Sequence, residues 1–280
     1  MVQGKITEQL AKSDIGLFCL KCDETRDASN VENMSVCLRF VVDGKPVEHL
    51  LSIVALQAVD AKSITAEILN ELRAQNIDPN NMISQCYDGA SVMSGCMGGV
   101  QKLISDELKR TVPYVHCFNH RLHLVVVHSM NRVSQVKQFF SICEQLYVFF
   151  RRQFLSSAYQ GHKLKRVLEQ RWTGHLESAK VIMENRSEII EALEEASNAC
   201  LDFSVAAAGL KAHVSKPDFS FIAAVVVKVL TVLQPPNAML QAKTVNMCHA
   251  VDMIQSSVHM LEELRSDDTF SSLANDAGKL

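Results

Sequence analysis

Two aspartates that each follow a predicted buried strand are the residues best placed to do chemistry. Asp23 follows the apolar run 15–22, and Asp88 follows the run 82–87. If the two strands lie side by side, both carboxylates converge at one edge of the sheet. Such carboxylates can hold divalent cations, and two cations about 4 Å apart stabilise the attacking and leaving oxygens of a phosphoryl transfer. Aspartate after a strand is also a common turn residue, so position alone favours a turn.

A second candidate group is the series Cys117-x-x-His120-x-x-His123, because thiolate and imidazole are good zinc ligands. No second ligand pair stands at the spacing of a zinc finger. On a helix, residues spaced by three drift around the axis and do not share one face. A polar structural or active-site role is therefore favoured over a zinc site.

The segment 88–99 is rich in glycine, and the segment 151–180 is basic. The first is not a phosphate-binding P-loop, since no Gly-Lys-Ser/Thr follows, and its small residues suit close packing of strand and helix. The second has seven lysines and arginines against two glutamates, and it holds the lone tryptophan, Trp172. Such a stretch can track phosphates while the ring stacks on a base. A solvated helix face around a core tryptophan explains the same pattern and is favoured by the residues alone.

Apolar runs and turn residues predict three strands, followed by alternating helices and strands. The predicted strands cover 15–22, 35–42, 47–56, 82–87 and 113–117, and the predicted helices cover 60–75 and 100–108. Asp43-Gly44 is a hairpin signal between the second and third strands. An antiparallel meander joined to a βαβ pattern predicts an α/β mixed sheet with helices on its faces. From about Asn119 onward the apolar spacing is helical. This order resembles a ribonuclease H-like core, although other α/β folds also fit it.

Composition excludes several classes of protein. The chain has 280 residues, 48% of them hydrophobic, and a net charge of −3, so a uniformly basic nucleic-acid coat is excluded but a local basic patch is not. Nine cysteines within apolar runs indicate reduced thiols in the cytosol or nucleus. The N-terminus lacks a signal-peptide core, and the longest apolar run, 219–233, is interrupted by Lys228. We expect neither secretion nor membrane residence.

Four segments together resemble the hAT (hobo/Activator-type) transposase superfamily, and most closely the subgroup of zinc finger MYM-type protein 1-like proteins and the related THAP-type repressor. They read DETRDASNVENMSVCLRFV, QCYDGASVMSGCMGGVQKLI, PYVHCFNHRLHLVVV and QRWTGHLESA. The resemblance runs in order from about Ile15 to about Lys180. The second and third segments are its most specific part.

The resemblance implies a ribonuclease H-like core over residues 1–135 and part of a helical insertion over residues 136–280. It further implies DDE-type strand cleavage with Mg²⁺ or Mn²⁺, in which Asp23 and Asp88 are the first two catalytic, metal-binding carboxylates. Cys117 and His120 match the superfamily's Cys-x-x-His motif beside the active site. Arg171 and Trp172 match an Arg-Trp pair whose tryptophan stacks on a flipped base. DNA, and also protein, are the implied partners, without a small-molecule substrate, and the nucleus is the implied location.

Two features of the family have no match. No cysteine or histidine precedes Cys19, so no zinc-binding DNA module is expected, and no glutamate stands in the context of the third catalytic residue. Without that ligand, metal binding and cleavage should both be poor. We therefore expect a catalytically incomplete, truncated transposase-like protein that binds DNA or protein. The alternatives are a fragment of an active transposase and a metal-independent α/β interaction module.

Overall fold

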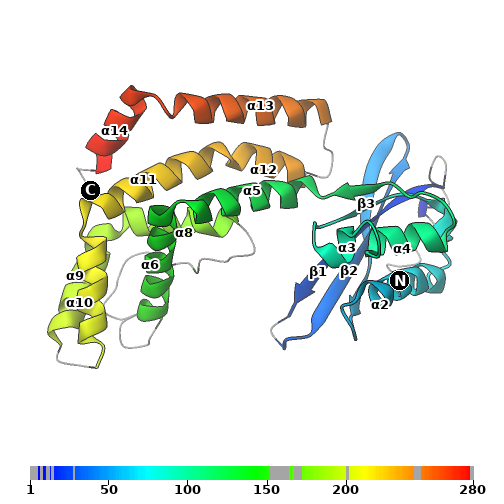
Figure 1. The fold of residues 1–280 in the computed structure, drawn as a ribbon, viewed down its shortest axis with the longest axis horizontal. Coiled ribbons are helices and arrows are strands. Elements are labelled where there is room, and N and C mark those ends of the chain that lie inside the picture. The colour runs from blue at the N-terminus through cyan, green and yellow to red at the C-terminus, as the bar shows by residue number, and fades with distance from the viewer. Residues whose placement is uncertain are drawn as a thin grey trace. The chain divides into compact units, whose positions relative to one another are not determined.

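A computed structural model describes residues 6, 9–10, 13, 16–27, 29–151, 164, 166, 172–199, 202–242 and 247–277 of the chain. The chain divides into two compact units, one of residues 1–121 with 241–244 and one of residues 122–240 with 245–280. The first of these divisions lies inside helix α5 (Phe118–Arg132), and the functional boundary after residue 135 that the resemblance implied stays a prediction. Figure 1 shows a sheet-containing unit and an all-helical unit, which are described separately below.

The predicted meander forms the first half of the sheet. It consists of β1 (Phe18–Arg26), β2 (Glu32–Val42) and β3 (Lys45–Ala55), each antiparallel to the next. The hairpin between β2 and β3 turns at Asp43 and Gly44, whose φ angles are 50° and 70°. Asparagine, aspartate and glycine tolerate this left-handed region best, which is why Asp-Gly predicted the turn.

Two parallel strands complete a five-stranded mixed sheet. They are β4 (Met82–Tyr87) and β5 (Tyr114–His116), and the strand order is β3-β2-β1-β4-β5. The mixed sheet expected from the sequence is therefore confirmed. Several boundaries differ by a few residues, and the end of β1 matters most: β1 continues to Arg26, so Asp23 lies inside the strand and not after it. The polar tail was not recognised as strand because its residues are polar and mostly exposed, so they lack the apolar alternation that marks a strand.

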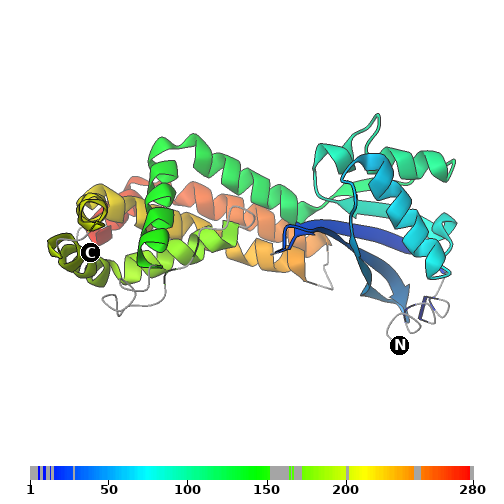
Figure 2. The same ribbon diagram turned by 90° about the horizontal axis from the view of Figure 1, so that it is seen from below.

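Helices α2 (Ala61–Ala74) and α4 (Val100–Glu107) cover one face of the sheet, as Figure 2 shows. The side chain of Asp60 caps α2 by accepting hydrogen bonds from the backbone N–H groups of Lys62 and Ser63 at 3.0 and 3.1 Å. Ile64, Ile68 and Leu72 lie on one side of α2 and are buried. They pack against alternate residues of the strands, including Phe18, Leu20, Val36 and Leu38.

The opposite face of the sheet is partly open to solvent. It presents the alternate residues of β1, namely Cys19, Lys21 and Asp23, which are half-buried or exposed. On β3 of the same face, Ile53 is 65% exposed. The Lys21 ammonium lies 2.7 Å from a carboxylate oxygen of Glu48, so an ion pair spans β1 and β3 across the intervening strand.

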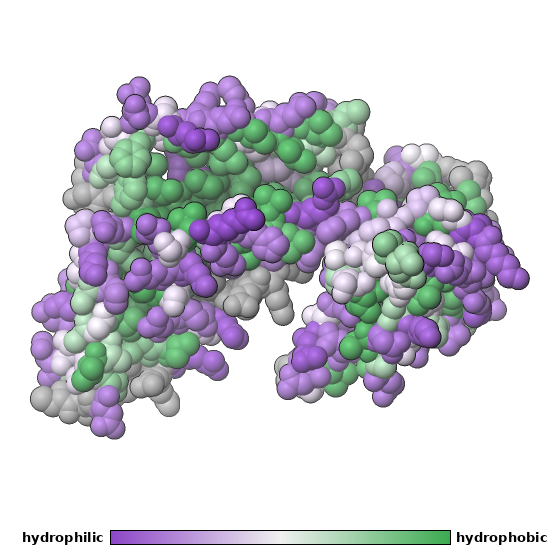
Figure 3. All heavy atoms as spheres, in the orientation of Figure 1, coloured by the Kyte–Doolittle hydropathy of each residue, from purple (hydrophilic) through white to green (hydrophobic). Residues whose placement is uncertain are grey.

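The second unit is helical, as predicted. Its described helices are α6 (Ser134–Phe150), α8 (Trp172–Glu184), α9 (Arg186–Asn198), α10 (Ser204–Val214), α11 (Pro217–Val232), α12 (Gln234–Gln241), α13 (Met247–Glu263) and α14 (Asp267–Ala277), together with most of α5. Large apolar side chains of α6, α8 and α11 form one core, including Phe139, Leu146, Trp172, Leu176 and Phe219. The green areas of Figure 3 mark apolar side chains that stay at the surface of this unit.

One stretch of the described helices, Pro217–Gln241, is long and apolar enough to cross a membrane by length and composition. The more apolar part of it is α11, which packs against α8 and α6 and buries Phe219, Ala223 and Leu230. The apolar composition thus has a structural explanation in the core of this unit, and the absence of a membrane partner remains a prediction.

Candidate functional site

The parallel pairing of β1 and β4 places the two predicted aspartates at one level of the sheet. Lys21 and Cys86 are register partners, and two residues further along the two strands lie Asp23 and Asp88. Asp23 is exposed, and its backbone carbonyl accepts a hydrogen bond from the Ser35 hydroxyl at 3.1 Å. The sheet edge expected from the sequence therefore exists, and both carboxylates belong to it.

Asp88 is held by the turn that follows β4. Its Oδ1 accepts a hydrogen bond from the Ala90 N–H at 3.1 Å, and its carbonyl accepts one from the Tyr114 hydroxyl at 2.9 Å. At the next residue, Gly89, an added Cβ would lie 2.3 Å from Cε1 of His116. The glycine-rich segment therefore packs closely on β5 at this point, and a larger residue would fit only if the His116 ring moved.

A third carboxylate, Glu24, joins this edge and was missed in the sequence. Burial raises the pKa of Glu24, and negative charge on Asp88, Glu32 and Asp23 raises it further. Of its acidic neighbours, Asp88 has the strongest effect. The sequence does show an acidic residue directly after Asp23. Glu24 was overlooked because the first strand was predicted to end at Cys22.

The pKa shift of Glu24 predicts a dependence of stability on pH. A raised folded-state pKa means that folding is favoured by protonation, so the wild type loses stability as pH rises above the ordinary glutamate range. Glu24→Gln should leave stability unchanged in acid and raise it modestly at neutral pH. Urea unfolding of the wild type and the variant, in acid and at neutral pH and with a chelator present, measures the difference in stability. The matched control is Glu67→Gln on α2, and a Glu24→Gln protein that is less stable at neutral pH would contradict the argument.

Carboxylates at this edge fit part of a divalent cation site. Asp23 and Asp88 would supply oxygen ligands, which Mg²⁺ and Mn²⁺ prefer. Within the described part of the chain, however, no three or more His, Cys, Asp or Glu residues are grouped so that they could hold a metal ion. A bound cation would supply electrostatic stabilisation of phosphoryl oxygens. The described residues would offer such a cation two carboxylates, Asp23 and Asp88, and nearby negative charge. They do not offer a complete set of ligands.

Cys117 and His120 lie beside the same edge. The Cys117 N–H donates to the carbonyl of Tyr87 at 2.9 Å, and its own carbonyl accepts the first hydrogen bond of α5, from Arg121 at 3.0 Å. The ring of His120 lies 5.6 Å from that of His116, centroid to centroid. Burial lowers the pKa of His116, and the neighbouring His120 and Arg121 lower it further. Cys117 and His120, the two members of the Cys-x-x-His motif, thus both lie next to His116, whose ring packs on Gly89.

The Cys117 thiol has an unusual environment. A hydrogen bond from the Cys86 thiol lowers the pKa of Cys117 to about 5, backbone N–H groups of His120 and Asn119 contribute in the same direction, and burial opposes them. Donation of that hydrogen bond raises the pKa of Cys86 well above its usual range. The zinc alternative gains no support: His123 Nδ1 accepts the Trp172 N–H at 3.2 Å, and among the described residues no group of three potential ligands is found.

Trp172 is placed in the core of the helical unit. Its side chain is 2% exposed, among the large apolar residues of α6, α8 and α11. This is the arrangement of a core tryptophan, and it leaves no exposed ring for stacking on a base. Arg171 and most of the basic stretch lie outside the described residues.

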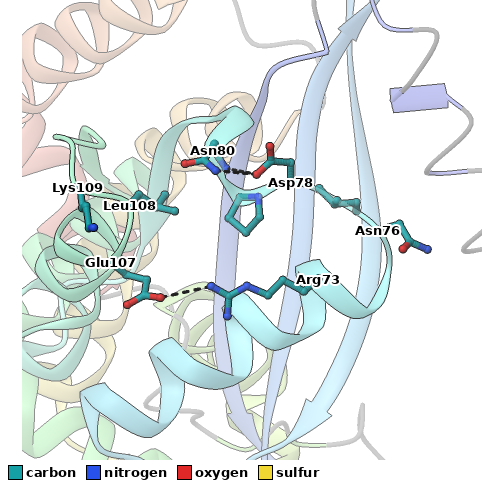
Figure 4. A pocket seen from close by; sticks show the side chains of 9 residues that line it. Arg73, Asn76, Asp78, Asn80, Glu107, Leu108 and Lys109 are labelled. Atoms are coloured by element: carbon teal, nitrogen blue, oxygen red, sulfur yellow. Dashed lines mark hydrogen bonds and ion pairs between the residues drawn. The ribbon is translucent and has the colours of Figure 1, made fainter.

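A separate hollow of about 590 Å³ lies at the other end of β4, near its first residue. Figure 4 shows the Arg73–Glu107 ion pair across it, at 3.4 Å, and the Asp78–Asn80 hydrogen bond at its rim. Its lining residues are Arg73, Asn76, Ile77, Asp78, Pro79, Asn80, Glu107, Leu108 and Lys109. The hollow therefore does not include Asp88, and we assign it no part in the carboxylate site.

The sheet-containing unit can be compared with a known family. Residues 2–99 match the ZMYM1/FAM200 RNase-like domain family, DUF4371. The match covers about a third of the chain. It includes β1 to β4 with Asp23, Glu24 and Asp88, and it ends before β5, Cys117 and the helical unit. The RNase-like nature of the mixed sheet is thereby confirmed.

Proposed function

We propose that this chain is a hAT transposase-like protein whose ribonuclease H-like unit has an incomplete acidic site and acts by binding DNA or a protein. The observation that carries the proposal is the pairing of β1 with β4, which brings Asp23 and Asp88 to one level inside the RNase-like match. Nuclear location and DNA as a partner follow from the proposed family.

Charge at the site supports weak cation binding without efficient cleavage. Burial raises the pKa of Glu24, and the neighbouring carboxylates raise it further; a cation would relieve this second, repulsive contribution. Two-metal cleavage needs enough ligands to hold both ions about 4 Å apart. In the described residues, Asp23 and Asp88 are not part of any group of three or more potential ligands. Mg²⁺ or Mn²⁺ is therefore proposed to bind weakly and mainly through these two residues.

Calorimetric titration with Mn²⁺ and a nicking assay on DNA with terminal inverted repeats test this proposal together. The full chain should bind Mn²⁺ weakly and leave the DNA intact. The double variant Asp23→Asn, Asp88→Asn should lose the binding, because amide oxygens carry no charge to hold the ion. The matched control is Asp78→Asn, Asp106→Asn, which removes two exposed carboxylates elsewhere in the same unit and should keep the binding.

Two results would replace the proposal by another. Mn²⁺-dependent nicking that disappears in Asp88→Asn would show an active DDE-type transposase core. Manganese binding that is absent, or unchanged in the double variant, would favour a metal-independent interaction module.

A further inference from the structure

The open face of the sheet gathers thiols around one lysine. Lys21 is the register partner of Cys37 on one side and of Cys86 on the other, so the three side chains share a face. Cys19 lies two residues before Lys21 and shares this face. Cys19, Cys37, Cys86 and Cys117 are all half-buried, so small reagents can reach them. Cys22 and Cys143, in contrast, are buried in the two cores.

Cys86 and Cys117 belong to this set and lie on neighbouring parts of the sheet. Cys86 belongs to β4, and Cys117 follows β5, where its N–H continues the ladder by bonding to the Tyr87 carbonyl at 2.9 Å. Cys86 pairs with Val115 in the ladder, so Cys117, two residues further on, lies diagonally across from Cys86 on the same face. The pKa shifts of the two thiols agree with this placement, since each has the other as its largest cause. The two side chains are therefore neighbours, although 31 positions separate them in the sequence.

The position of Cys117 makes its sulfur the better nucleophile. It stands immediately before the first residue of α5, where the backbone N–H groups of Asn119 and His120 point at the sulfur. The ammonium of Lys21 acts on it from the sheet. Helix N-termini and nearby cations are the two environments that activate cysteines. Lys21 acts on both thiols, but only Cys117 also stands at a helix N-terminus.

We propose that Cys86 and Cys117 form a reversible dithiol–disulfide site whose oxidant is a small peroxide. The Cys117 sulfur attacks one oxygen of hydrogen peroxide, so an S–O bond forms, the O–O bond breaks and hydroxide leaves. The Cys86 sulfur then attacks the sulfur of the sulfenic acid and displaces its hydroxyl group. The protons of the two thiols end in water, so two thiols and one peroxide give one disulfide and two waters. A dithiol reductant reverses the bond by thiol–disulfide exchange.

Two features distinguish this site from the carboxylate site of the proposed function. It uses sulfur and no metal ion, and its residues lie on the face of the sheet at Lys21, with Cys86 two positions before Asp88 on β4. A disulfide would join β4 to the start of α5 beside the Asp88 turn. The site therefore stands whether or not Asp23 and Asp88 bind metal.

Peroxide treatment of the full reduced chain, followed by alkylation in denaturant and peptide mass spectrometry, tests the site. We expect the peptides of Cys86 and Cys117 to become joined, with the loss of two hydrogen atoms, and to separate again on reduction. In Cys86→Ser, the Cys117 sulfenic acid should accumulate and be trapped by dimedone. In Cys117→Ser, no bridge to Cys86 should form.

The matched controls are Cys19→Ser and Cys37→Ser, which remove half-buried thiols from the same face and should keep the bridge. Circular dichroism of each variant checks that the fold is retained. Joined peptides that involve Cys19 or Cys37 in place of the proposed pair would overturn the assignment. Peroxide that oxidises exposed Cys96 while leaving Cys86 and Cys117 alkylatable would overturn it as well.

Discussion

Replacing Trp172 with alanine is expected to lower the free energy of unfolding of the helical unit by about 3–5 kcal/mol. The side chain is 2% exposed and lies in the core formed by α6, α8 and α11. Its removal deletes a large apolar surface and leaves a cavity that the surrounding helices fill only in part. Urea unfolding followed by far-UV circular dichroism measures the loss. The fluorescence of the wild type gives a second signal from the same unit, since Trp172 is the lone tryptophan.

Two controls separate a core role from a role in DNA recognition. Val205→Ala deletes an apolar side chain that is 83% exposed on α10 and should change stability by less than about 0.5 kcal/mol. Trp172→Phe keeps most of the buried surface and should recover most of the stability. A folded Trp172→Phe protein should bind DNA as the wild type does. Unchanged stability in Trp172→Ala, with loss of DNA affinity, would instead show a stacking tryptophan.

Replacing Gly89 with alanine is expected to cost about 1–3 kcal/mol, because the new methyl group overlaps a packed ring. The added Cβ would stand 2.3 Å from Cε1 and 2.7 Å from Nε2 of His116. Either the ring or the Asp88 turn must move, so manganese binding through Asp88 should weaken as well. Thermal and urea unfolding measure the first effect, and calorimetry measures the second.

The sequence offers a matched glycine for this experiment. Gly98 lies in the same glycine-rich segment, but nothing stands within 4 Å of its added Cβ. Gly98→Ala should therefore be neutral or slightly stabilising. Combining Gly89→Ala with His116→Ala should recover part of the loss, since the overlap is between these two residues. Equal effects of the two glycine substitutions would show that the close approach at Gly89 does not matter.

Local features of the chain were accessible from the sequence because short-range chemistry determines them. The Asp43-Gly44 turn, the cap of α2 at Asp60 and the limits of β4 all depend on residues a few positions apart. Turn dihedral angles, capping hydrogen bonds and apolar periodicity act over that range. The identity of Asp88 as the residue after a buried strand was predictable for the same reason.

Long-range packing decided which of these residues meet. The parallel pairing of β1 with β4 brings Asp23 level with Asp88, and the continuation of β1 to Arg26 places Glu24 under the influence of Asp88. The sequence by itself determined the strands, the turns and the candidate acids. A core position for Trp172 was already favoured by the residues, whereas only the tertiary structure decided that Asp88 acts on Glu24 and that Cys86 lies beside Cys117. These contacts join residues far apart in the chain, so they depend on how strands order and helices pack, which local propensity does not encode.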